Sequence, residues 1–247
     1  MDIAGRFFAH GSAFLAPVLY VQGLYTRAKI AKLPEAGGPR EGTVAGDANL
    51  LRLLLMGEST AAGVGAADHN EGLAGQMART VNAMTGATVN WQVHASNGLT
   101  AAGLRSSLGE LATDTRPDLI VIVLGANDVF RLQGPMKWEK DLRALVDTIR
   151  EQCGFAPVML SAMPPIGEFP ALPQPMRSVL SLRAQLLDDA TDRLAGKMAG
   201  VHFVPLFVEE DPSGLFSEDG IHPSPTCYAR WGRHIAEASV DHLPRRG

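Results

Sequence analysis

Five short apolar runs alternate with segments of helical periodicity along residues 49–247, and this order restricts the chain to few folds. The expected strands cover residues 51–57, 87–95, 118–124, 156–162 and 201–206. Between and after them, apolar residues recur every three or four positions, as on the buried face of a helix. Alternating strands and helices form right-handed crossovers and a parallel sheet with helices on both faces. We therefore predict an α/β fold, a three-layer α/β/α sandwich around a five-stranded parallel sheet.

This fold also predicts where a functional site would lie. Ligands of open parallel sheets bind beyond the carboxyl ends of the strands. We therefore expect the chemistry of the chain in the loops that follow Met56, Val93, Leu124, Ala162 and Leu206.

Charge and residue content argue against several classes of protein. The chain has 22 basic and 26 acidic residues, a net charge of −4, which argues against a broad nucleic-acid-binding surface. Two cysteines are too few for a four-cysteine zinc site or a disulfide framework, and the seven histidines include no H-E-x-x-H pair. Residues 63–68 lack the third glycine of a dinucleotide-binding loop. We expect no nucleic-acid partner, no metal and no cofactor.

The first 48 residues differ from the rest, and we predict an N-terminal apolar segment and extended linker over 1–48, followed by one domain over 49–247. Residues 7–26 carry no charge, but Pro17 and several polar residues interrupt them, so they suit a membrane-spanning helix poorly. A basic start and a convincing cleavage site, which a signal peptide needs, are missing. We expect a cytoplasmic protein.

The role of this N-terminal segment stays open from the sequence. It is compatible with a helix packed on the domain or on a second subunit, which would make residues 7–32 a site of self-association. It is also compatible with a peripheral anchor on the inner membrane, where Arg27, Lys29 and Lys32 would meet anionic headgroups. A cleaved or spanning signal is the third alternative.

The loop after the first expected strand reads Gly57-Glu58-Ser59. A serine between a strand and a helix can be exposed, and the helix N-terminus directs backbone N–H groups at its oxygen. Serine is also a common helix cap, so this motif alone indicates little. It is not the G-x-S-x-G elbow of α/β-hydrolases, because Ala61 occupies the position of the second glycine.

Three further loops contain residues with complementary chemistry. The N–H of Gly98 and the side-chain amide of Asn127 are donors that can stabilise a negative substrate oxygen. Near the C-terminus, Asp219 precedes His222 by three residues, close enough in a turn to hold one ring nitrogen. The other ring nitrogen is then free to accept a proton from a hydroxyl group. A serine, two donors and an Asp–His pair are thus all expected at the carboxyl edge of the sheet.

These motifs resemble, in order, the four blocks of the SGNH hydrolases, also called the GDSL esterase/lipase superfamily. The resemblance covers about residues 50–240 and implies a flavodoxin-like fold and a metal-free serine hydrolase that cleaves acyl esters. Ser59 would be the nucleophile, His222 the general base and acid, and Asp219 its orienting partner. The N–H groups of Ser59 and Gly98 and the side chain of Asn127 would form the oxyanion hole. The chain departs from the family at Glu58, where an aspartate is usual.

The substrate is less constrained by the sequence. Residues 163–175 contain five prolines and form a loop expected to cover the mouth of the site. The residues expected to contact substrate are Glu58, Ile166, Phe169, Leu172, Phe216 and Ile221. These side chains favour simple acyl esters or lipids as substrates. The enzyme could then be a lysophospholipase or a thioesterase that acts at a membrane. An acetyl esterase for acetylated sugars and a catalytically silent binding protein remain as alternatives.

Overall fold

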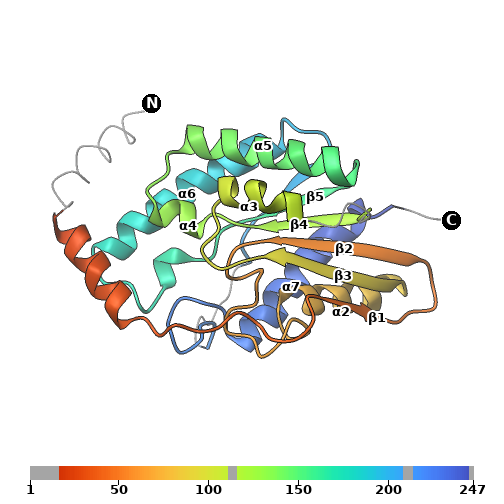
Figure 1. Cartoon of the computed structure of the whole chain (residues 1–247), viewed down its shortest axis with the longest axis horizontal. Helices are drawn as coiled ribbons and strands as arrows, with labels where there is room; N and C mark the ends of the chain where they lie inside the picture. The colour runs from red at the N-terminus through yellow and green to blue at the C-terminus, as the bar shows by residue number, and fades with distance from the viewer. Residues whose placement is uncertain (1–16, 111–115, 208–213, 245–247) are drawn as a thin grey trace.

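The computed structural model describes residues 17–110, 116–207 and 214–244 (Figure 1). Its centre is a sheet in the order β1-β3-β2-β4-β5-β6. The parallel strands are β2 (Leu50–Gly57), β3 (Thr88–Ala95), β4 (Leu119–Val123), β5 (Val158–Ser161) and β6 (Val201–Val204). Their order is that of the flavodoxin-like folds. The predicted α/β/α sandwich is confirmed, and each predicted parallel strand lies within a residue or two of its expected place.

The sheet has six strands rather than the five predicted. The extra strand, β1 (Glu41–Val44), runs antiparallel to β3 at the sheet edge, with Gly42 opposite Trp91. It comes from the stretch expected to be a linker. Its side chains alternate between exposed and half-buried, so the strand depends on backbone pairing to β3 rather than on an apolar run. A search for apolar runs therefore overlooks it.

Helices cover both faces of the sheet (Figure 1). One face packs against α2 (Leu73–Thr85) and α7 (Pro225–Ser239), through the strand residues Leu53, Leu55 and Val121. The other packs against α3 (Ala101–Ser107), α5 (Pro135–Cys153) and α6 (Met176–Ala195), through Leu54, Met56 and Ile122. Alternate residues of one strand thus enter opposite cores, as the two-residue period of a strand requires. A short helix, α4 (Ala126–Phe130), follows β4, and single 3-10 turns lie at Leu108–Glu110, Ile166–Glu168 and Val240–His242.

The first described element is a helix over residues 17–29. Its Gln22 side chain donates to the carbonyl of Gln174 at 2.6 Å and accepts from the N–H of Met176 at 3.2 Å. The helix is therefore tied to the end of the proline-rich loop and the start of α6. No helix within the described ranges combines the length and the apolar character that crossing a bilayer would require.

Candidate active site

Ser59 lies two residues after the last residue of β2, in a chain of tight turns. The N–H of Ala62 donates to the Glu58 carbonyl at 2.8 Å, and the N–H of Val64 donates to the Ser59 carbonyl at 3.0 Å. The next helix, α2, begins only at Leu73, so the serine lies in these turns and not at a helix N-terminus. Glycines at 63 and 65, with φ of +73° and +93°, favour tight turns here over a regular helix. The serine is 9% exposed.

Gly57 allows the serine turn to lie against the neighbouring strand. A Cβ atom at this position would lie 2.0 Å from the carbonyl oxygen of Val123 in β4, so any side chain would push the strands apart. The next residue, Glu58, donates its N–H to the same carbonyl at 3.1 Å. The glycine of the motif thus fixes Ser59 at the sheet edge.

The buried Asp219 and the half-buried His222 form a pair on the loop before α7. The Asp219 Oδ2 atom lies 2.5 Å from Nδ1 of the His222 ring, while Oδ1 accepts the N–H groups of Ile221 and His222 at 3.0 Å each. Burial alone would raise the pKa of Asp219, but the hydrogen bonds from His222 and Ile221 outweigh it and lower that pKa. An ionised Asp219 therefore holds the ring with Nε2 directed away from it.

The serine turn and the Asp–His loop pack against each other. A Cβ atom at Gly65 would lie 2.6 Å from Ser217 Oγ and 2.9 Å from the Pro223 carbonyl, so only glycine permits this contact. The Tyr228 hydroxyl of α7 donates to the Val64 carbonyl at 2.7 Å and joins the two segments from below. Among the described residues, no hydrogen bond joins the Ser59 hydroxyl to the His222 ring. Such contacts often tighten only when substrate is bound.

Two of the three expected oxyanion donors are available. Among the described residues, neither the N–H of Ser59 nor that of Gly98 donates to a protein acceptor. Gly98 has φ of +84°, a conformation that favours glycine. The Asn127 amide is differently engaged, because its Nδ2 donates both to Glu58 and to the Leu99 carbonyl, the latter at 3.1 Å.

Glu58 is a buried acceptor for the turn that carries Asn127. Its carboxylate receives the N–H of Ala126 at 2.8 Å, the N–H of Asn127 at 3.2 Å, and the Asn127 side-chain amide. Burial raises the pKa of Glu58 to about 8, although the N–H groups of Ala126 and Asn127 favour its ionised form. The hydrogen bonds of Glu58 hold Asn127 in place. The Glu58 side chain itself is only 3% exposed, so it offers little surface to a substrate.

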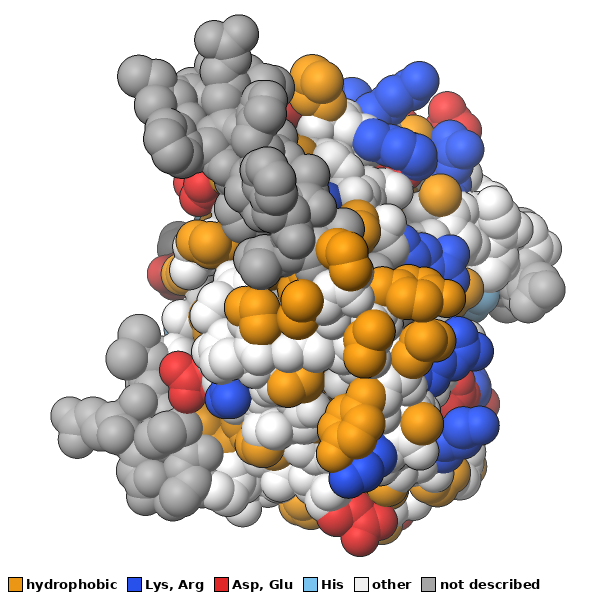
Figure 2. Space-filling view, turned by 90° about the vertical axis from the view of Figure 1, so that its left-hand side faces the viewer, with side chains coloured by type: hydrophobic (Ala, Val, Ile, Leu, Met, Phe, Trp, Pro, Cys, Tyr) orange, Lys and Arg blue, Asp and Glu red, His pale blue; other side chains and the backbone are white. Residues whose placement is uncertain are grey.

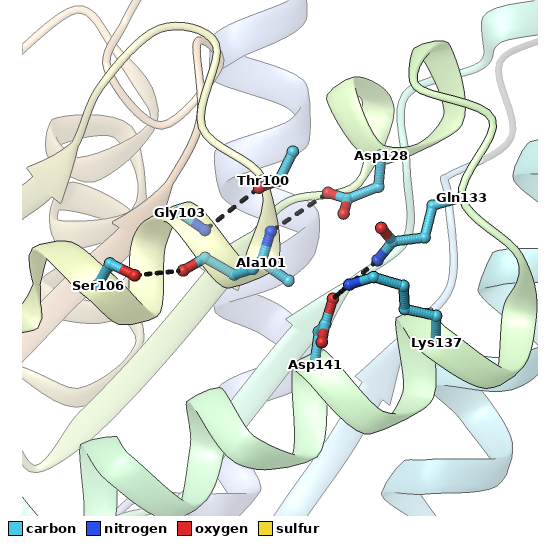
Figure 3. Close-up of polar contacts among 9 residues, drawn as sticks. Thr100, Ala101, Gly103, Ser106, Asp128, Gln133, Lys137 and Asp141 are labelled. Carbon is cyan, nitrogen blue, oxygen red and sulfur yellow. Dashed lines mark hydrogen bonds and ion pairs between the residues drawn. The ribbon is translucent and has the colours of Figure 1, made fainter.

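Asp128 ties the Asn127 turn to the loop that carries Gly98. Figure 3 shows its carboxylate directed at the N–H of Ala101, the first residue of α3, at 3.2 Å. Thr100 caps the same helix end by accepting the Gly103 N–H. Burial raises the pKa of Asp128 to about 6.

A second polar cluster lies at the start of α5. In Figure 3, Gln133 and Lys137 both donate to Asp141 and hold the segment between α4 and α5.

The expected linker also supports the site. Glu35 accepts the N–H of Asn97 at 2.6 Å and the Ser96 hydroxyl at 3.1 Å, and it pairs with Arg40. Arg40 in turn donates to the Ala95 carbonyl at 2.5 Å. Residues 35–40 therefore hold the loop before Gly98. The sequence carries no signal for this contact, because the partners are about 60 residues apart.

The expected substrate contacts divide into buried and accessible groups. Ile166, Phe169 and Leu172 are each 1% exposed and belong to the core under the proline-rich loop. Phe216 and Ile221 are half-buried next to Asp219 and His222. Phe169 meets Phe216 edge to face, with ring centroids 5.6 Å apart. The buried side chains thus hold Phe216 in place, and the accessible surface next to His222 comes from Phe216 and Ile221.

The chain is similar in sequence and in fold to known esterases and acylhydrolases. The chain is 29% identical over 185 residues to the GDSL-like esterase Rv1075c of Mycobacterium tuberculosis, which covers 72% of this chain. The match spans only 58% of the length of that mycobacterial relative. Among solved structures, TesA has a TM-score of 0.62 at 24% identity, covering 78% of this chain and 99% of its own. A lipase/acylhydrolase from Enterococcus faecalis has a TM-score of 0.62 at 20% identity, covering 80% and 99%.

These two structural likenesses show a shared fold. The sequence itself matches a family model, that of the GDSL-like lipase/acylhydrolase family. The match covers residues 55–230, from the last part of β2 into α7. That range includes the serine turn, both donor loops and the Asp–His pair. The chain belongs to the GDSL-like lipase/acylhydrolase family.

Proposed function

We propose that the protein is a serine carboxylic-ester hydrolase in which Ser59, His222 and Asp219 act as a catalytic triad. The observation that carries this proposal is the 2.5 Å contact between Asp219 and His222 on a loop that packs against the serine turn. It leaves Nε2 of the ring as the nitrogen that can accept a proton. The family match supports ester hydrolysis in general terms.

The reaction proceeds through a covalent acyl-enzyme. Nε2 of His222 takes the proton from the Ser59 hydroxyl while Oγ bonds to the ester carbonyl carbon. The tetrahedral intermediate then breaks its bond to the alcohol oxygen, which receives the proton from His222. A water molecule repeats the sequence on the acyl-serine and releases the acid and the free enzyme.

Negative charge on the carbonyl oxygen is stabilised by the N–H groups of Ser59 and Gly98. Their freedom from protein acceptors supports this assignment. Asn127 contributes once one of its amide hydrogens turns from the Leu99 carbonyl to the substrate oxygen. Glu58 then acts as a positioning residue, because it holds the other side of the Asn127 amide and the backbone of its turn.

Acyl esters with an apolar chain suit the site better than acetylated sugars. Phe216 and Ile221 are the half-buried apolar side chains next to the Asp–His pair. The three tryptophans, which would offer stacking surfaces for a sugar, are elsewhere, and Trp91, Trp138 and Trp231 are all buried. A lysophospholipid and a thioester both fit this chemistry.

The test is hydrolysis of p-nitrophenyl esters from acetate to palmitate by the wild type and by S59A. We expect S59A to lose at least about a thousandfold in kcat, because removal of the nucleophile leaves only binding and the oxyanion donors. The matched control is S106A, which removes an exposed serine on α3 and leaves the rate unchanged.

Chain-length preference separates the substrate classes. A rate that peaks at eight carbons or more supports a lipid, whereas a peak at acetate supports an acetyl esterase. Equal rates for the wild type and S59A with every ester would refute the triad.

A further inference from the structure

The helix over residues 17–29 exposes an apolar face to solvent. Of the large apolar residues that are exposed in the described ranges, five of twelve lie on this one helix: Val18, Tyr20, Val21, Leu24 and Tyr25. Tyr20 is 69% and Val21 63% exposed. The side that meets the rest of the protein is mixed: Leu19 is half-buried, Thr26 is buried, and Gln22 is bonded to Gln174 and Met176. An amphipathic surface helix usually turns its apolar side inward, whereas most of the large apolar side chains of this helix face outward.

Basic residues border this apolar face on both sides. With about 100° between successive residues of a helix, the five side chains occupy an arc of roughly 160°. Arg27 lies next to Tyr20 at one margin of the arc, and Lys29 lies next to Val18 at the other. Both are exposed, and the ammonium group of Lys29 lies 4.6 Å from the centre of the Tyr25 ring. Lys32 comes three residues after the end of the helix and is also exposed.

This charge pattern distinguishes between the partners that an apolar face can take. Residues 17–32 contain three basic residues and no acidic ones. Two copies packed helix to helix through this face would bring their basic residues together, and neither helix has an acidic residue to pair them. An anionic lipid surface would instead neutralise all three, while tyrosine side chains suit the boundary between headgroups and acyl chains.

The position of the helix connects it to the active-site edge. Gln22 binds Gln174 and Met176, at the end of the loop that follows β5. The same loop meets the Asp–His loop, where the N–H of Ala171 donates to the Gly220 carbonyl at 3.3 Å. In Figure 1 the helix lies at the end of the molecule towards which the parallel strands run. Figure 2, which views that end, shows apolar side chains spread over it and Lys and Arg side chains along one margin.

We propose that the apolar face of the helix over residues 17–29 binds an anionic bilayer surface. Val18, Tyr20, Val21, Leu24 and Tyr25 enter the boundary region, and Arg27, Lys29 and Lys32 contact the headgroups. The carboxyl edge of the sheet then faces the lipid. Binding does not require the catalytic step, so it is testable independently of the proposed function.

The experiment is flotation of the full chain with vesicles of phosphatidylcholine alone or with added phosphatidylglycerol. We expect binding to the anionic vesicles that weakens as salt screens the headgroup charge. The R27Q/K29Q variant should bind about 30-fold more weakly at low salt, from about 1 kcal/mol for each basic residue near the surface. The V21E/L24E variant should lose most of its binding to the anionic vesicles, because it places two carboxylates in the apolar face.

M84E is the matched control, because Met84 is 50% exposed and lies at the end of α2, near the amino ends of the strands. It should float like the wild type. Hydrolysis of a water-soluble ester, or the circular dichroism spectrum if no ester is cleaved, shows that each variant is folded. Absence of flotation by the wild type, or equal loss in M84E, would overturn the proposal. So would a wild-type dimer in light scattering that V21E/L24E converts to a monomer, since the face would then be a subunit interface.

Discussion

Glu58 receives three hydrogen bonds from one turn, and each comes from Ala126 or Asn127. If its role is to position Asn127, then a glutamine in its place should impair catalysis without affecting the nucleophile. Glutamine keeps the length of the side chain but directs an NH2 group at a donor. A buried donor left without an acceptor costs about 1–3 kcal/mol.

We therefore expect E58Q to lower kcat about tenfold with little change in KM, because the Asn127 amide, as a proposed oxyanion donor, would act on the transition state. N127A alone should cost about 100-fold or more, as for other oxyanion donors. In the double variant the two effects should not add, since Glu58 would act through Asn127. Fully additive losses would assign Glu58 to another role. E218Q, at an exposed neighbour of Asp219, serves as the control.

Residue spacing predicts some parts of the site and is silent on others. Asp219 and His222 are three residues apart, so a turn brings them together, and the structure shows their contact. Glu58 and Asn127 are 69 residues apart, and their contact depends on β2 and β4 being neighbours. No local pattern reports such a pair. The burial of Ile166 and Phe169 was equally hidden, because apolar residues in a loop suit a core and a binding site alike.

Elements with a long apolar face are predictable from the sequence, and shorter ones are not. The five parallel strands and the helices α2, α5, α6 and α7 each bury a stripe of side chains that the sequence displays. β1 and α4 are only four and five residues long. They are fixed by the neighbours that they contact, β3 for the strand and Glu58 for the helix N-terminus.

The pairing of β1 with β3 can be tested at Gly42. A Cβ atom there would lie 2.4 Å from the ring of Trp91, which is 2% exposed in one of the two cores. We expect G42V to lower the free energy of unfolding by about 1–3 kcal/mol, because the ring must move out of a packed position. Urea denaturation followed by circular dichroism measures this value. T43V, at an exposed position of the same strand, should change it by less than about 0.5 kcal/mol. Equal values for both variants would show that β1 adds little to the fold.

For the whole molecule, the same edge of the sheet gathers the serine turn, the Asp–His loop and the helix over residues 17–29. The folded chain also keeps several carboxyl groups away from water, and this has an electrostatic cost. Glu58 and Asp128 are buried and Asp188 is half-buried, and this burial raises the pKa of Glu58 to about 8, of Asp188 to about 7 and of Asp128 to about 6. In the unfolded chain these groups titrate near pH 4. The folded chain therefore binds more protons between those limits.

It follows that the free energy of unfolding falls as pH rises from about 5 to about 9. We expect a thermal midpoint about 10 °C lower at the higher pH, which corresponds to a loss of a few kcal/mol for a chain of this size. Asp219, whose pKa is lowered, has the opposite effect, because its stabilisation is present above pH 4 and disappears only in stronger acid.

Asp188 offers the cleanest test because it lies outside the proposed triad and oxyanion hole. Its carboxylate accepts the N–H of Met163 at 3.1 Å, and an asparagine keeps an oxygen for that bond while removing the titration. Between about pH 5 and pH 9 the free energy of unfolding of D188N should therefore fall less than that of the wild type, by roughly 1–2 kcal/mol, and its thermal midpoint should fall less steeply. D192N removes an exposed carboxylate from the same helix and should retain the wild-type slope. If both variants follow the wild type, the Asp188 carboxyl is ionised at the same pH in the folded and unfolded chains. Its burial then carries no electrostatic cost.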